Sequence, residues 1–232
     1  MTKWIVNSAI LAQLRKTDPV AVTATVRYGS WTVGPPGNPP PEDPYAEPLA
    51  SCKSLHDLRS AIAPYEWLLY DPESWDYTPP SEQQNPFDAL AHAGQWAHRH
   101  GYQLISAPAR DLANTCTIFP KLKDETITGW YLRTGIAAVA ARYADGVSIQ
   151  SQAETTSGRY EPMVRDAAIQ VRAANPYALV LAGVSTRYGT AQQMAAAAQS
   201  VAQLTDGYWL NVPGPDPDIS KAVAFLKLMA AT

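Results

Sequence analysis

The stretch from Gly146 to Ser185 reads GVSIQSQAETTSGRYEPMVRDAAIQVRAANPYALVLAGVS. Gly146 to Gln152 and Ala178 to Ser185 have the composition of short strands, and helical periodicity lies between them from Tyr160 to Ala174. A strand, a helix and a second strand in this order predict a parallel βαβ unit with a right-handed crossover. This unit places the chain in the α/β class.

The same alternation extends to both sides of this unit. Further strands are expected at 67–71, 102–107 and 208–212, and further helices at 86–100, 126–143, 191–204 and 219–229. Near the N-terminus the pattern predicts a helix over 5–16, a strand over 20–31 and a short helix over 54–62. A Pro-rich loop or lid is expected at about 34–48.

These elements favour a TIM-type (β/α) barrel, incomplete or irregular, formed by a single domain over residues 1–232. Six strands are recognisable, and one or two more have room in Ser30–Pro64 or Ala113–Lys123. An open doubly wound sheet is the alternative. That alternative lacks its usual cofactor signature, because no Gly-x-Gly-x-x-Gly or Walker-type loop follows a strand.

Composition removes several classes of partner. The 18 basic and 21 acidic residues include no Lys or Arg run, so neither nucleic acid nor an anionic membrane is expected to bind. No apolar stretch reaches the roughly 18 residues that cross a bilayer, and the first residues lack a signal peptide's apolar run. We therefore expect a soluble protein.

Metal and nucleophile signatures are also missing from the sequence. Cys52 and Cys116 fit either one disulfide in an exported protein or two buried thiols in a reducing compartment. His98 and His100 are two apart and do not share a helical face, so they make a poor metal pair. No Gly-x-Ser-x-Gly elbow is present, so nucleophilic hydrolase chemistry lacks a signature, and we expect acid/base chemistry without a metal or cofactor.

Two carboxylates follow the strand at 67–71, in the segment Trp67–Trp75, which reads WLLYDPESW. Because side chains alternate along a strand, Asp71 and Glu73 are expected to project from one face at its carboxyl end. Two nearby carboxylates repel each other, which raises one pKa toward the working pH and predicts a general acid/base pair. The alternative is that Asp71 caps a turn before Pro72 while Glu73 is a solvated loop charge.

Other polar and aromatic residues lie near the expected strand ends and are candidates for substrate binding. Gln150 and Gln152 share one face of their expected strand, where they either contact a ligand or hydrogen-bond within the barrel. Trp209 is either a platform for a sugar ring or a core residue. The full set of candidates is Arg27, Tyr28, Trp75, Gln150, Gln152, Trp209 and Asn211.

An apolar strand closing on Asp-x-Glu, with Gln-rich and Trp-containing later strands, resembles the chitinase-like group of (β/α)-barrel glycoside hydrolases. The resemblance implies that Glu73 is the general acid and that Asp71 orients a substrate acetamido group. That group carries further aspartates upstream, where this chain has Trp67 and Leu69. Its motif also lies on the fourth strand, whereas the pattern here predicts the second or third.

The sequence thus indicates a cofactor-independent acid/base enzyme, glycoside hydrolase-like, that acts on an oligosaccharide or another small molecule. Because Asp71 and Glu73 share one strand, such a mechanism needs substrate assistance or a third carboxylate such as Glu154. Two alternatives remain open, a cyclase or isomerase of small-molecule biosynthesis and a non-catalytic ligand-binding barrel.

Overall fold

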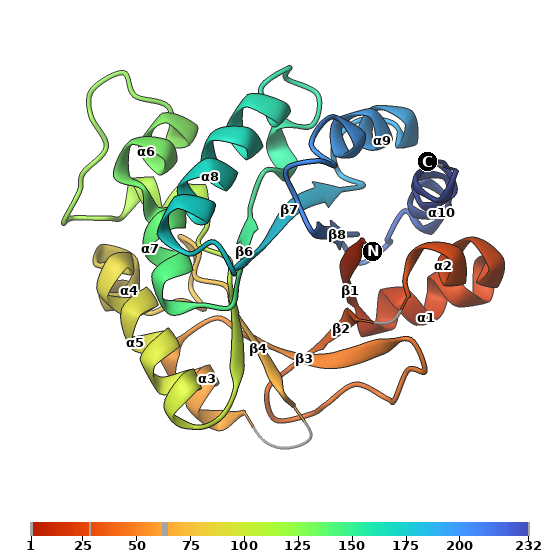
Figure 1. Ribbon diagram of the computed structural model, residues 1–232, viewed down its shortest axis with the longest axis horizontal. Coiled ribbons are helices and arrows are strands. Elements are labelled where there is room, and N and C mark those ends of the chain that lie inside the picture. The colour runs from red at the N-terminus through yellow and green to blue at the C-terminus, as the bar shows by residue number, and fades with distance from the viewer. Residues whose placement is uncertain (1, 28, 62–64, 232) are drawn as a thin grey trace.

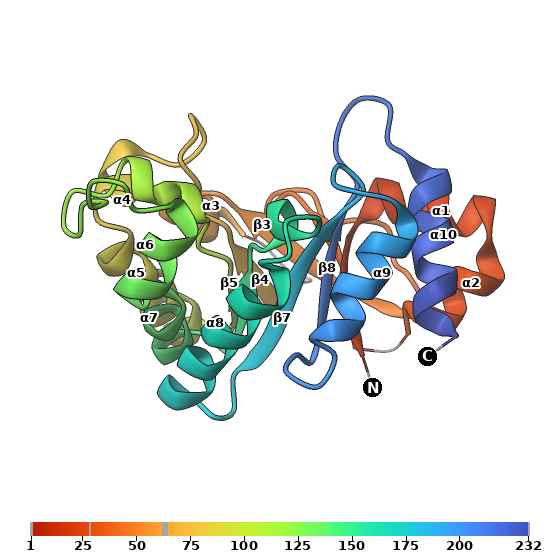
Figure 2. The same ribbon diagram turned by 90° about the horizontal axis from the view of Figure 1, so that it is seen from above.

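The computed structural model describes residues 2–27, 29–61 and 65–231. Within these residues eight parallel strands pair in chain order and close into a barrel, with helices packed around it (Figures 1 and 2). The strands are β1 (Lys3–Asn7), β2 (Ser30–Gly34), β3 (Ala46–Cys52), β4 (Trp67–Tyr70), β5 (Gln103–Ser106), β6 (Gly146–Ile149), β7 (Leu179–Ser185) and β8 (Gly207–Asn211). The predicted TIM-type barrel is confirmed and is complete, because β1 pairs with both β2 and β8.

Ten α-helices and two short 3₁₀ helices connect the described strands. They are α1 (Ser8–Thr17), α2 (Pro19–Thr25), α3 (Leu55–Ser60), α4 (Pro80–Gln84), α5 (Pro86–Arg99), η1 (Arg110–Asn114), α6 (Ile127–Thr134), α7 (Ile136–Tyr143), η2 (Gln152–Glu154), α8 (Tyr160–Ala174), α9 (Ala191–Ser200) and α10 (Ile219–Ala230). The helix predicted over 126–143 is divided at Gly135, which has a left-handed backbone (φ 64°). No helix in the described parts of the chain is long and apolar enough to cross a membrane.

The first expected element was wrong, because β1 occupies the start of the helix predicted over 5–16. Alternate residues of β1 face opposite sides, with Ile5 in the barrel interior and Trp4 and Val6 against the surrounding helices. The Asn7 side chain then accepts hydrogen bonds from the amides of Ala9 and Ile10 and caps α1. Because β1 has only five residues and α1 begins directly after it, the sequence pattern does not distinguish the strand from the helix.

The strand predicted over 20–31 was also wrong, since Pro19–Thr25 forms α2. Asp18 caps this helix by accepting from the amide of Ala21. The β-branched Val22 and Thr25 are buried on the face that packs toward α10, so tertiary packing overrides their preference for strands. The next two strands, β2 and β3, lie in Ser30–Pro64, where room for them was expected, and β3 begins inside the predicted Pro-rich loop.

The core has two layers separated by the barrel wall. Inside the barrel lie Ile5, Trp31, Val33, Leu49, Leu69, Ile105, Ala107 and Leu181. The larger layer lies between the wall and the helices and takes the alternate residues of the strands, such as Leu68 and Val180. Residues that continue the inward alternation beyond the strand ends therefore point into the mouth of the barrel.

Cys52 and Cys116 are both buried and free, which overturns the disulfide alternative. Burial raises the pKa of the Cys52 thiol, and the charge of Asp57 adds to this shift. A thiol in this environment is inert at neutral pH.

Gly94 allows α5 and α7 to pack closely. A Cβ atom at this position would overlap the carbonyl oxygen and Cβ of Tyr143, at the end of α7. We expect Gly94→Ala to lower the free energy of unfolding by about 1–3 kcal/mol, although alanine favours helices, because the backbone has to move. Gly37→Ala is the control, since a Cβ there meets no atom within 4 Å. Urea unfolding of both variants measures the difference, and equal stabilities would contradict this packing argument.

Candidate active site

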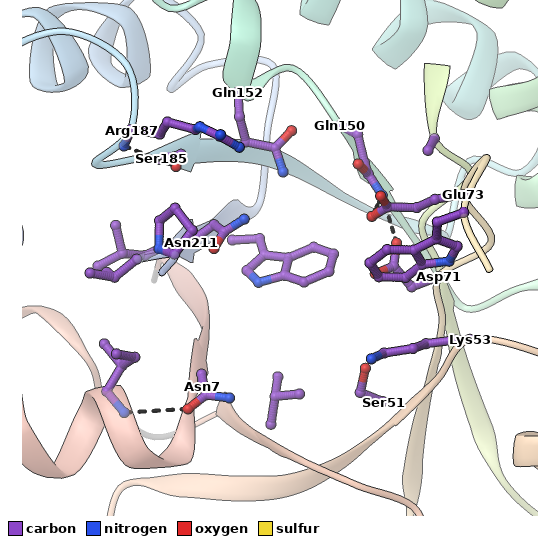
Figure 3. Close-up of a pocket in the computed structure, with 18 of the residues that line it drawn as sticks. Asn7, Ser51, Lys53, Asp71, Glu73, Gln150, Gln152, Ser185, Arg187 and Asn211 are labelled. Atoms are coloured by element: carbon purple, nitrogen blue, oxygen red, sulfur yellow. Dashed lines mark hydrogen bonds between the residues drawn. The ribbon is translucent and has the colours of Figure 1, made fainter. Parts of the chain in front are cut away.

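Polar side chains form a ring at the carboxyl end of the barrel, where the strand ends meet around a cavity of about 1040 Å³ (Figure 3). The ring consists of inward-facing residues at or just beyond the strand ends, namely Asn7, Ser51, Asp71, Gln150, Ser185 and Asn211. Val33 and Trp209 contribute apolar surface to the same cavity. This is where TIM barrels place their chemistry.

Asp71 is held in line with β4 by the continuing ladder of hydrogen bonds. Its amide donates to the Cys52 carbonyl (2.9 Å), and the amide of Ala107 donates to the Tyr70 carbonyl (2.8 Å). The side chain continues the inward set and is only 5% exposed. Asp71 is therefore a buried carboxyl that faces a cavity, and not the turn cap that the sequence left open as an alternative.

Glu73 lies in an ordered turn and not in a solvated loop. Its amide donates to the Thr78 hydroxyl (3.2 Å), and that hydroxyl donates to the Lys53 carbonyl (2.9 Å). The next amide, of Ser74, donates to the Asp111 carboxylate (3.0 Å). Since Thr78 is fully buried, these bonds fix the backbone that carries Glu73.

The Gln150 amide joins the two carboxyls. Its nitrogen lies 2.6 Å from Asp71 Oδ1, 3.4 Å from Glu73 Oε1 and 3.0 Å from the Ala107 carbonyl (Figure 3). Gln150 follows β6, so one amide connects the ends of three strands around the barrel. Of the two alternatives that the sequence left open for Gln150, the structure shows the hydrogen bonds within the barrel.

Burial raises the pKa of both carboxyls. For Asp71 the pKa lies well above its usual range, and the nearby charge of Glu73 adds to the effect of burial. For Glu73 burial, helped by the charge of Asp111, raises the pKa to about 7, while Gln150 and Lys53 act in the opposite direction. Two buried acids so close together favour a state in which the pair holds a proton at neutral pH.

Lys53, just after β3, is a cation that lines the same cavity. Its Nζ lies 4.3 Å from the ring centre of Tyr77 and 5.1 Å from that of Trp75. Its charge lowers the pKa of both Asp71 and Glu73. Lys53 therefore limits how far burial raises the pKa of the two acids.

Most of the residues predicted from the sequence meet at this cavity, which is lined by Asp71, Glu73, Trp75, Gln150, Gln152, Trp209 and Asn211. Arg27 does not: it is exposed, at the amino end of β2, where its Nε donates to the Ala24 carbonyl. Arg27 was expected at the site because a strand was predicted over 20–31, whereas β2 starts three residues after Arg27. Tyr28, predicted with it, lies outside the described residues.

The sequence analysis missed four residues of the cavity, which are Asn7, Ser51, Lys53 and Asp111. Asn7 and Ser51 end strands that were not recognised. Asp111 lies on η1, which has no counterpart in the sequence pattern. Ser185 and Arg187 also line the cavity, and the signal for them is their position at the end of a strand that was predicted.

Glu154 is not available as a third catalytic carboxylate. It is 5% exposed and accepts hydrogen bonds from Arg110, Thr128, Ser157 and Arg159. These partners outweigh its burial and lower its pKa to about 2. The residue connects η2 to α6 and η1, and its role is structural.

The cavity is also short of metal ligands. In residues 2–27, 29–61 and 65–231, no three His, Cys, Asp or Glu side chains come together in a way that would hold a metal ion. The acids at the mouth instead accept hydrogen bonds from the Gln150 amide, and the charge of Lys53 lowers their pKa.

Glu73 should cost stability above neutral pH. Its folded pKa of about 7 exceeds the ordinary 4.5, so the folded state binds more protons between these values and loses stability as pH rises through them. We expect Glu73→Gln to raise the free energy of unfolding by about 2 kcal/mol at pH 8 and to change it little at pH 4. Asp76→Asn, which removes an exposed carboxyl nearby, is the control. Chemical unfolding at both pH values tests this, and an equal effect at pH 4 and pH 8 would contradict it.

Comparisons with known proteins give a likeness in structure alone. No protein-family model matches the chain, and no curated protein matches its sequence. Among solved structures it is similar to the endoglucanase Cel6 from Mycobacterium tuberculosis, in complex with methyl-cellobiosyl-4-deoxy-4-thio-β-D-cellobioside, with 17% sequence identity and a TM-score of 0.41. The match covers 71% of this chain and 57% of that chain, so this chain spans less than two thirds of that enzyme's length.

Proposed function

We propose that the protein is a cofactor-independent acid/base enzyme acting on a carbohydrate, a glycoside hydrolase-like protein with Glu73 as the proton donor and Asp71 as its partner. The observation that carries this proposal is the Glu73 carboxyl, whose pKa of about 7 is reached beside a second buried acid at the mouth of the barrel. A general acid has to hold its proton at the working pH, and ordinary exposed glutamates do not.

The position of the pair on the barrel supports this assignment. Asp71 and Glu73 follow β4, the fourth strand, and the fourth strand carries the Asp-x-Glu motif of the chitinase-like group that this segment resembles. The lower strand number expected from the sequence resulted from the unrecognised β1 and β3. The place of Asp71 and Glu73 after the fourth strand therefore supports the resemblance to that group.

The distribution of acids favours a substrate-assisted route. Among the described residues lining the cavity, the carboxylates are Asp57, Asp71, Glu73 and Asp111, which all follow β3, β4 or β5. The facing wall, formed from β7, β8 and β1, contributes amides and hydroxyls. A direct mechanism needs acids on opposite sides of the scissile bond, so the attacking oxygen is proposed to come from the substrate.

In this proposal the substrate carries an acetamido group beside the scissile bond. Glu73 gives its proton to the glycosidic oxygen as the bond to the anomeric carbon breaks. The acetamido oxygen forms a bond to that carbon. Asp71, which is ionised when Glu73 holds the proton that the pair shares, accepts from the acetamido N–H. Water then opens the cyclic intermediate and returns a proton to Glu73. Asp71 and Glu73 are both within reach of one Gln150 nitrogen, which supports their acting on one sugar ring.

The remainder of the cavity suits a carbohydrate. Trp209 and Trp75 offer ring faces on which the C–H surface of a sugar packs, and Gln152 and Asn211 offer amides for its hydroxyls. The volume of about 1040 Å³ is at the upper end of the roughly 300–1,000 Å³ typical of small-molecule sites. That size favours an oligosaccharide over a single small metabolite.

A non-catalytic binding barrel is the less favoured reading. It requires no perturbed acid, whereas burial raises the pKa of both Asp71 and Glu73. Burying two carboxyls is costly, and a protein that only binds a ligand gains little from it.

Glu73→Gln is expected to lower kcat by about 100-fold or more on any glycoside that the protein cleaves, because the proton donor is lost. A panel of methylumbelliferyl glycosides, with and without an N-acetyl group, measures activity and identifies the sugar. Asp76→Asn, which removes an exposed carboxyl three residues after Glu73, is the control and should retain activity. Unchanged turnover in a folded Glu73→Gln protein would overturn the assignment, and equal cleavage of sugars lacking the N-acetyl group would overturn substrate assistance.

The pH profile tests the same acid independently. Activity is expected to fall as pH rises through about 7, since Glu73 loses its proton there. Lys53→Met removes a charge that lowers this pKa, so the falling limb should move to higher pH. The measurement is kcat/KM between pH 5 and 9 for both proteins. A limb that stays in place or moves to lower pH in the variant would contradict this role for Lys53.

A further inference from the structure

Arg187 lies in the cavity on the wall that faces the carboxyl pair. It follows β7, beside Ser185 and close to Asn211, whereas Asp71, Glu73 and Lys53 project from the other side (Figure 3). Its side chain is exposed within the mouth of the barrel. The cavity therefore has a cation on each of two opposing walls.

The two cations differ in what they face. Lys53 is engaged with the aromatic rings of Trp75 and Tyr77 and with the charges of Asp71 and Glu73. Among the described residues the guanidinium of Arg187 has neither a hydrogen bond nor a carboxylate within 4 Å, while six other arginines form ion pairs, namely Arg15, Arg110, Arg133, Arg159, Arg165 and Arg172. Arg187 has all of its donors available to a ligand.

The backbone that carries Arg187 is held in place. The Arg187 amide donates to the Ser185 hydroxyl (3.2 Å), and the amide of Thr186 donates to the Asn211 carbonyl (3.1 Å). The Thr186 carbonyl accepts from Lys221 Nζ (2.8 Å), which ties the turn to α10. A fixed backbone lowers the entropic cost of using a long side chain for binding.

We infer that Arg187 binds an oxyanion group, a carboxylate, sulfate or phosphate, on the carbohydrate that the site accepts. A guanidinium presents paired N–H donors that match such a group, and charge-assisted bonds of this kind are the stronger ones. The amide of Asn211 and the hydroxyl of Ser185 lie on the same wall and add neutral donors. The inference rests on the proposed function for its choice of a sugar as the carrier.

The position of the acids sets the orientation of this ligand. A negative group beside Asp71 and Glu73 would be repelled, and it would raise their pKa further. At Arg187 the same group lies on the wall formed from β7, β8 and β1, whose described lining residues include no carboxylate. The acidic substituent is therefore placed across the cavity from the scissile bond.

The test compares matched sugars that differ only in charge at one carbon. Glucuronate, glucose 6-sulfate, glucose 6-phosphate and neutral glucose are titrated into ¹⁵N-labelled protein, and dissociation constants are taken from NMR shifts of the mouth residues. Three proteins are compared, the native chain, Arg187→Gln and Arg142→Gln. Arg142 is an exposed arginine near the end of α7, which leads to the amino end of β6, so its loss changes the net charge equally but leaves the mouth intact.

At least one charged sugar is expected to bind about tenfold more tightly than glucose to the native chain and to Arg142→Gln. Arg187→Gln should lose that preference and keep its affinity for glucose. Equal binding of charged and neutral sugars to the native chain, or a preference that survives in Arg187→Gln, overturns the inference. These are binding measurements, so failure to cleave any glycoside would remove the proposed function without producing either of those results.

Discussion

Closure of the barrel is the constraint on which the rest of the structure depends. β1 pairs with β8 in the register Val6 to Leu210, so Asn7 and Asn211, from opposite ends of the chain, come to adjoining positions at the mouth. Gly207 is needed at this junction, because a Cβ there would overlap the backbone of Lys3. Since all strands run in parallel, every carboxyl end opens on the same side, and residues scattered over two hundred positions share one cavity.

The stability of this arrangement and its chemistry come from different parts of the molecule. The layer between the barrel wall and the helices contains most of the buried apolar side chains, including Trp4, Trp130 and Phe225. The mouth instead holds two acids whose burial opposes folding when they are ionised. An apolar layer of this size offsets that cost, as is usual where an active site is built on a rigid scaffold.

Sequence patterns predicted the second half of the barrel well and the first quarter poorly. From β5 onward each strand is followed by a clear helical period or a turn, and α8 was predicted with its observed bounds. Before β4 the signals conflict, because α2 is rich in β-branched residues and β3 contains Pro48 and lies beside a proline-rich loop. Packing against α10 and pairing with β2 and β4 decide these segments, and neither contact is visible in a local pattern.

The residues of the candidate site also divide into those that the sequence predicted and those that it did not. Asp71, Glu73, Gln150 and Asn211 could be predicted because each follows a recognisable strand. Thr78 could not, since its role is to hold backbone groups of a turn through one hydroxyl. The contact between Arg110 and Glu154 could not be predicted either, because it joins segments 44 residues apart.

The amide of Gln150 has a further consequence. Its nitrogen carries two hydrogens but lies near three oxygens, those of Asp71, Glu73 and the Ala107 carbonyl. The amide therefore cannot satisfy all three acceptors fully at once, and a carboxyl that takes up a proton needs it less. Because the third acceptor is a backbone carbonyl just beyond β5, the hydrogen bonding of the barrel wall is coupled to the ionisation of its acids through this one amide.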